Sequence, residues 1–170
     1  VCSSDLEDAE KVLNYFVPCP YDERIDVCGE VSVCFRDAGH LLGSSFIEMW
    51  VSEGEESCKL IFSGDLGNGN RALIRDPEKP VSADYLIIES TYGDREHDVP
   101  PDYAAELAQV LAQTFSRGGN VVIPAFSVGR TQEMLYYLRQ IKQNRMLPSF
   151  QNFEVYVDSP LAVEATRIFN

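Results

Sequence analysis

Apolar and polar side chains alternate along the first half of the chain with the period of β-strands. The segment 30–36 places apolar residues at every second position (Val31, Val33 and Phe35), as expected for a half-buried strand. Further β-type runs are predicted at 45–52, 59–63 and 84–89. An apolar stripe at helical spacing precedes these strands and predicts a helix over roughly 5–16.

The second half has a longer period, in which strands and helices alternate. The pattern predicts a helix from Asp102 to about Arg117, strands at 120–125 and 153–157, and helices over 131–144 and from Pro160. This alternation is typical of a parallel sheet with helical crossovers. The change of pattern at Pro100-Pro101 predicts two domains, 1–98 and 99–170.

Charge divides the chain in the same place. The 170 residues hold 14 Lys and Arg against 27 Asp and Glu, a formal net charge of −13. Residues 1–98 carry 8 basic and 21 acidic side chains, whereas residues 99–170 carry 6 of each. The hydrophobic share of 45% indicates a globular chain and excludes disorder and coiled coil.

The cysteines and the lengths of the apolar runs indicate the cellular compartment of the protein. Five cysteines at irregular spacing, without a C-x-x-C pair, indicate reduced thiols. No apolar run approaches the ~20 residues that span a bilayer, so we expect a cytoplasmic protein without a membrane partner.

Candidate chemistry lies where two predicted strands end. His40 follows the strand 30–36 in a glycine-flanked loop, and Asp65 follows the strand 59–63 between two glycines. Imidazole and carboxylate are donors that suit Zn²⁺, which takes three or four protein ligands. Taken alone, a histidine beside glycine such as His40 is more often a loop or core residue than a ligand, and Gly64-Asp65-Leu66-Gly67 is a common type of turn. The residues themselves therefore indicate half a metal site.

Five ordered motifs resemble one family. They are DAGHLLGS (37–44), FSGDLG (62–67), ESTYGDREH (89–97), IPAFSVGRTQE (123–133) and VDSPLA (157–162). Together they resemble the metallo-β-lactamase-fold RNA nucleases of the β-CASP family, which include the nuclease subunit of the cleavage and polyadenylation complex. The resemblance implies an α/β fold in which part of an αββα sandwich precedes the first part of a Rossmann-like, three-layer β-CASP domain.

The resemblance also assigns roles to residues. His40 matches a histidine that ligates one metal, Asp65 matches the carboxylate that bridges two zinc ions, and Glu89 matches an acidic residue that supports a catalytic histidine later in the chain. It therefore implies a zinc-dependent ribonuclease that hydrolyses phosphodiester bonds in RNA processing. We expect the Cα atoms of His40 and Asp65 to lie within roughly 10 Å, since both side chains would reach metal bonds of ~2.0–2.2 Å.

RNA contacts are expected from the more neutral second half. Ser127, Gly129 and Arg130 lie between a predicted strand and a helix N-terminus, where free N–H groups attract phosphate, and Ser159 stands in the same position before the next helix. Local alternatives are an Arg130–Glu133 pair at i+3 and simple capping by Ser159.

Two parts of the family pattern are not in this sequence. The His-x-His-x-Asp-His motif and the late β-CASP histidines are missing, and His97 matches neither. We expect an internal segment of a longer nuclease, inactive by itself and prone to self-association as a homo-oligomer. The alternatives are a metallo-β-lactamase-fold hydrolase of a small ester or thioester, and a non-catalytic RNA-binding or scaffold homologue.

Overall fold

The computed structural model describes residues 3–96 and 100–169, which form two compact units. The strand unit comprises the residues up to 38, together with 44–66 and 77–89. The helical unit comprises 39–43, 67–76 and the residues from 90 onward. Two short loops of the first half therefore pack with the second half of the chain. The predicted boundary between 98 and 99 falls on residues outside the described ones and stays a prediction.

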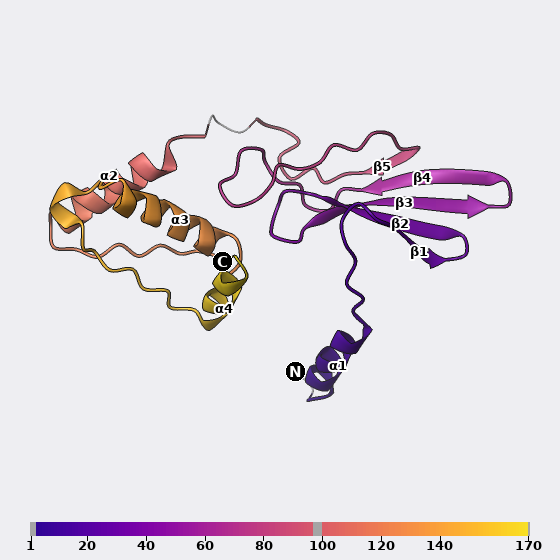
Figure 1. Cartoon of the computed structure of the whole chain (residues 1–170), viewed down its shortest axis with the longest axis horizontal. Helices are drawn as coiled ribbons and strands as arrows, with labels where there is room; N and C mark the ends of the chain where they lie inside the picture. The colour runs from indigo at the N-terminus through magenta and orange to yellow at the C-terminus, as the bar shows by residue number, and fades with distance from the viewer. Residues whose placement is uncertain (1–2, 97–99, 170) are drawn as a thin grey trace. The chain divides into compact units, whose positions relative to one another are not determined.

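The strand unit is built on one five-stranded sheet (Figure 1). The strands follow one another in chain order: β1 (Arg24–Cys28), β2 (Val31–Asp37), β3 (Ser45–Glu53), β4 (Glu56–Phe62) and β5 (Tyr85–Ile87). The first four pair antiparallel and β5 runs parallel to β4. Helix α1 (Ser3–Val12) and a 3₁₀ turn (Leu13–Tyr15) precede the sheet and confirm the helix predicted over 5–16.

The two faces of this sheet differ because side chains alternate along each strand. Ladder partners share a face, so the register gives one face that is apolar except at the strand ends, where Asp37, Ser45, Glu53 and Glu56 lie. Its apolar residues are Ile25, Val31, Val33, Phe35, Ile47, Met49, Val51, Cys58, Leu60 and Phe62. Such a face suits burial against a second layer, as in the predicted αββα sandwich. The described residues contain one sheet, so the sandwich itself stays a prediction.

The opposite face of the sheet carries a network of charges centred on Glu48. Its side chain is 5% exposed and receives hydrogen bonds from Lys59 Nζ (2.5 Å) and Arg36 Nε (3.1 Å). Arg36 also donates to Asp22 (2.6 Å). Burial alone would raise the pKa of Glu48, but the hydrogen bonds from Lys59 and Arg36 outweigh burial and lower it. Glu48 is therefore an ionised carboxylate that ties β2, β3 and β4 together.

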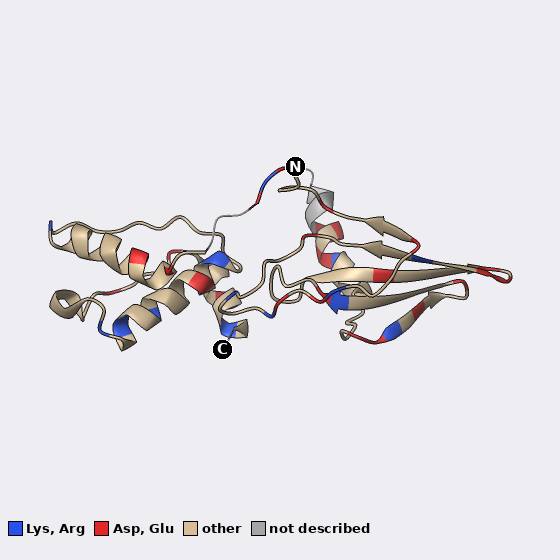
Figure 2. Ribbon diagram, turned by 90° about the horizontal axis from the view of Figure 1, so that it is seen from above, with Lys and Arg blue, Asp and Glu red and all other residues tan. Residues whose placement is uncertain are grey.

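Helices dominate the helical unit. They are α2 (Tyr103–Phe115), α3 (Arg130–Gln143), a 3₁₀ turn (Pro148–Phe150) and α4 (Pro160–Ile168). Asp102 begins α2 by accepting the Ala105 N–H (3.0 Å), as an N-cap does. A core between α2 and α3 is formed by buried apolar residues at helical spacing: Ala104, Ala108, Leu111, Leu138, Ile141 and Leu147. Acidic and basic residues occur in both units (Figure 2).

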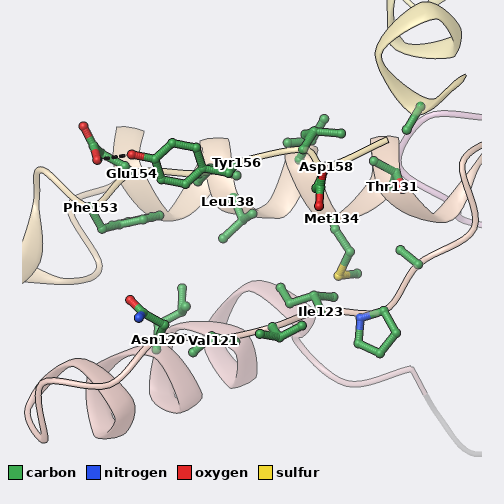
Figure 3. Close-up of a pocket in the computed structure, with 18 of the residues that line it drawn as sticks. Asn120, Val121, Ile123, Thr131, Met134, Leu138, Phe153, Glu154, Tyr156 and Asp158 are labelled. Atoms are coloured by element: carbon green, nitrogen blue, oxygen red, sulfur yellow. Dashed lines mark hydrogen bonds between the residues drawn. The ribbon is translucent and has the colours of Figure 1, made fainter. Parts of the chain in front are cut away.

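The strands predicted at 120–125 and 153–157 are wrong for the described residues. Both segments are extended, but neither pairs in a ladder, and a strand forms only when its N–H and C=O groups find a partner strand. They flank a cavity of about 870 Å³ into which Met134 and Leu138 of α3 project (Figure 3). The α/β class is confirmed, whereas the parallel sheet of a three-layer domain is not formed here.

Strand β1 is the element that the pattern analysis missed. Its apolar residues Ile25, Val27 and Cys28 are interrupted by the charged Asp26, and four of its five residues are exposed. β1 is an edge strand, and its hydrogen bonds to β2, rather than burial of its side chains, stabilise it.

Two strand-end loops cross at very short range within the helical unit. Gly67, two residues after Asp65, passes so close to Gly39 that a Cβ atom added to Gly67 would lie 1.6 Å from the Gly39 carbonyl oxygen. Only a residue without a side chain fits there. The loop that follows β2 is therefore fixed against the loop that follows β4.

We expect Glu48→Gln to lower the free energy of unfolding at pH 7 by about 3 kcal/mol, because Arg36 and Lys59 would lose their buried counter-charge. The pKa of Glu48 is lowered by folding, so its contribution is complete above its unfolded pKa of about 4.3 and is lost as the pH falls through the folded value. Urea unfolding should therefore show a gap between wild type and variant that narrows from pH 5 downward. Glu56→Gln, at an exposed position of β4, is the control, and a pH-independent gap would contradict the network.

Gly67→Ala should destabilise the chain by roughly 1–3 kcal/mol, since the added methyl group forces the two loops apart. Hydrogen exchange should quicken in 39–43 and 67–76. The matched control is Gly29→Ala, where an added Cβ would meet nothing within 4 Å. Equal stability of both variants would show that the loops do not cross as described.

Candidate functional site

Asp65 lies in a loop that a buried serine closes. Ser63 follows β4, is 4% exposed, and accepts the Glu89 N–H on its hydroxyl (2.9 Å) while donating to the Gly64 carbonyl (2.7 Å). Its own N–H donates to Ile87 O (2.9 Å) at the end of β5. Ser63 thereby joins the two chain segments that leave β4 and β5.

Glu89 holds the same loop through its side chain. Its Oε1 accepts the N–H of Leu66, the residue directly after Asp65, at 2.7 Å. The carboxylate thus fixes the main chain that carries Asp65. Sequence reasoning singled out Glu89 for a different role, and the anchoring contact with Leu66 spans 23 residues of sequence.

His40 lies in the helical unit, on the loop that crosses Gly67. The guanidinium of Arg71 donates from Nη1 to the His40 carbonyl oxygen (2.8 Å). Arg71 Nη2 also lies 3.6 Å from Glu133 Oε2 on α3. Arg71 was not among the predicted site residues, and its position is evident only from these contacts between distant segments.

The four predicted RNA-contact residues gather at the N-termini of α3 and α4. The hydroxyls of Ser127 and Ser159 lie 3.2 Å apart, Gly129 is the N-cap of α3, and Arg130 is its first residue. Gln132, 3% exposed, accepts the Gly129 N–H (2.7 Å) and donates to Ser127 O (3.0 Å). The structure therefore brings together Ser127, Gly129, Arg130 and Ser159; whether they bind RNA stays a prediction.

Local roles for two of these residues are confirmed. Arg130 Nη1 donates to Glu133 Oε2 at 2.8 Å, the predicted i+3 pair. Ser159 accepts the Ala162 N–H (3.2 Å) and so caps α4. The Arg130 side chain is still 55% exposed, which leaves most of its guanidinium in contact with solvent.

The donors for a metal are divided between the two units. Asp65 belongs to the strand unit and His40 to the helical unit, so their expected approach stays a prediction. Among residues 3–96 and 100–169, no three His, Cys, Asp or Glu side chains lie together in a group that could hold a metal ion. The donor types fit zinc, whereas the number of donors is below that of a closed site.

The cavity beside α3 has a different character from these loops. Apolar residues dominate its lining, among them Val121, Ile123 and Phe153 (Figure 3). The charged side chains on it, Glu154 and Asp158, are acidic, and Glu154 accepts a hydrogen bond from Tyr156. Its walls therefore suit apolar groups rather than phosphate.

Within the part of the chain that the structure describes, no helix has the length and apolarity needed to cross a membrane.

Comparison with known proteins gives consistent matches. Residues 131–170 match the Beta-Casp domain family. The sequence is 40% identical over 163 residues to ribonuclease TTHA0252 from Thermus thermophilus, and this alignment covers 96% of this chain and 36% of that protein. It is 33% identical over 162 residues to transcription termination factor FttA from Methanosarcina mazei, covering 93% of this chain and 24% of that protein. A third relative, cleavage and polyadenylation specificity factor subunit 3-I from Arabidopsis thaliana, is 29% identical over 166 residues, 97% of this chain and 23% of that protein.

The chain spans roughly a quarter to a third of the length of these relatives. The matches cover nearly all of it, including both strand-end loops and the start of α3. The helix predicted from Asp102 is also present, as α2. These matches support the family that the five motifs predicted, the metallo-β-lactamase-fold RNA nucleases of the β-CASP type.

Proposed function

We propose that this chain is part of a zinc-dependent nuclease that hydrolyses phosphodiester bonds during RNA processing. The observation that carries the proposal is the pair of strand-end loops bearing His40 and Asp65, in a chain 40% identical to a relative named as a ribonuclease. In the proposed centre His40 and Asp65 would be among the residues that hold zinc. Further ligands would be needed to complete this centre, because a zinc site takes three or four protein ligands.

A bound zinc pair would supply hydroxide near neutral pH and stabilise charge on the phosphate. The contribution of this chain is to place and hold the donors. Glu89 fixes the main chain beside Asp65, and Ser63 fixes Glu89 in turn. Such supporting contacts orient metal ligands and raise affinity in metal sites generally.

RNA binding is proposed for the start of α3. The chain is acidic overall, and phosphates are normally met by Lys and Arg. Arg130 is the first residue of α3 and its side chain is 55% exposed, and the positive end of the helix dipole at this terminus also favours an anion. Ser127, Gly129 and Ser159 surround this position and would contact the RNA backbone.

The proposal is tested by comparing RNA cleavage by this chain with that of a longer polypeptide containing it. We expect the longer protein to cleave single-stranded RNA and Asp65→Ala to reduce its rate at least roughly 100-fold, because a metal ligand is lost. This chain alone should retain far less than one zinc per molecule after dialysis and should not cleave RNA, since two ligands leave Zn²⁺ largely hydrated. Zinc is measured by mass spectrometry and cleavage with a fluorescent RNA.

Three outcomes would contradict this account. Hydrolysis of a thioester but not RNA by the longer protein would favour the small-substrate hydrolase. RNA binding without zinc or cleavage would favour the non-catalytic homologue. Tightly held zinc in this chain, with RNA cleavage that disappears in Asp65→Ala, would show that its own residues complete the site. Asp26→Asn, on the exposed edge strand β1, is the control for a general effect of lost charge.

Arg130→Met should weaken the binding of a single-stranded RNA oligonucleotide and lower the slope of log affinity against log salt by about 1, because one phosphate contact is removed. Fluorescence anisotropy at several salt concentrations measures both quantities. The matched control is Arg167→Met, since Arg167 forms the same i+3 pair, with Glu164, and is 69% exposed. An equal loss in both variants would show that the start of α3 does not contact RNA.

A further inference from the structure

Arg71 connects three segments of the helical unit that are far apart in sequence. We propose that Arg71 is a positioning residue, which fixes the loop of His40 against the first turn of α3. The inference rests on the proposed function, because it takes His40 as the metal ligand. Arg71 lies outside the two motifs that carry His40 and Asp65. Its proposed role is to position the His40 loop, and it neither ligates metal nor contacts RNA.

The first contact acts on the main chain of the ligand itself. Arg71 Nη1 donates to the carbonyl oxygen of His40 at 2.8 Å. Because this carbonyl belongs to the residue that carries the imidazole, the hydrogen bond restricts rotation of the peptide plane next to the ring. A planar guanidinium is well suited to this task, since its donors keep a fixed geometry relative to one another.

The second contact ties the same guanidinium to α3. Arg71 Nη2 lies 3.6 Å from Glu133 Oε2, and Arg130 Nη1 reaches the same oxygen at 2.8 Å. The Glu133 side chain is only 11% exposed. Loss of Arg71 would leave this largely buried carboxylate with Arg130 as the partner described here, so the ion pair favours keeping Arg71 against α3.

Two close approaches support the same arrangement. Gly67 lies directly against Gly39 at one end of the His40 loop. A Cβ atom added to Gly129 would lie 2.6 Å from Leu41 Cδ2, so the residue after His40 packs on the turn that begins α3. The His40 loop is therefore held from two sides by packing and from a third by Arg71. Arg71 is the polar member of this set and the one that can be altered without a steric clash.

Exposure distinguishes Arg71 from Arg130. The Arg71 side chain is 23% exposed, and its two terminal nitrogens both face protein acceptors. The Arg130 side chain is 55% exposed. Arg130 is thus accessible to a phosphate, whereas Arg71 sets the spacing between the His40 loop and the turn that carries Gly129 and Arg130.

The chain holds only two histidines, His40 and His97, which allows a direct test by NMR of the imidazole rings. His40→Gln assigns the signals. In the metal-free chain, Arg71→Met should shift and broaden the ring signals of His40. Arg71→Lys, which keeps the charge but not the planar fork, should give an intermediate change. Arg75→Met is the matched control, because Arg75 lies in the same segment and is exposed.

Zinc titration of the same samples gives the second readout. We expect zinc to shift the His40 signals in the wild-type chain with weak affinity, and Arg71→Met to raise the apparent dissociation constant roughly tenfold, as loss of a contact behind a ligand does. If zinc does not shift the His40 signals in the wild-type chain, the weak binding expected of this chain is contradicted, and the metal-free comparison alone decides the positioning role.

Unchanged His40 signals in metal-free Arg71→Met would overturn the proposal. A shift of equal size in Arg75→Met would also overturn it, because the effect would then be a general loss of positive charge. If Arg71→Met loses the dispersed amide signals of a folded chain, Arg71→Lys decides by the same criteria. A His40 shift in that variant supports the positioning role, and its absence contradicts it.

Discussion

The crossing of two main-chain segments at Gly39 and Gly67 is the constraint on which the candidate site depends. Because the two backbones approach more closely than any side chain permits, the loop after β2 and the loop after β4 must move together. The remaining contacts follow from this approach. Arg71, four residues beyond Gly67, comes within reach of the His40 carbonyl, and Leu41 comes to lie on Gly129.

Regular elements of the fold were largely predictable, because they depend on local periodicity. The strands β2 to β5 and the helices α2 to α4 lie where the apolar patterns placed them. The failures concern pairing. The segments 120–125 and 153–157 have the composition of strands but no partner strand among the described residues, and β1 is a strand only because β2 pairs with it. Pairing depends on segments elsewhere in the chain and is not encoded in a local pattern.

The candidate site divides in a similar way. His40 and Asp65 were recognisable as chemically capable residues at strand ends, and the family resemblance added Glu89 and the residues at the start of α3. Ser63 and Arg71 were missed, because their roles arise from hydrogen bonds that span 26 and 31 residues of sequence. Neither residue type is unusual at its position. Only the three-dimensional contacts show that one holds the Asp65 loop and the other the His40 loop.

The central claim is that these two loops serve one metal centre, and a crystal structure of a longer protein containing this segment tests it most directly. Diffraction data collected on both sides of the zinc absorption edge locate the metal independently of the protein. The account predicts a zinc peak at ~2.0–2.2 Å from both a ring nitrogen of His40 and a carboxylate oxygen of Asp65, with their Cα atoms within roughly 10 Å. A zinc ion bound by other residues, with His40 and Asp65 much farther apart than that, would contradict it.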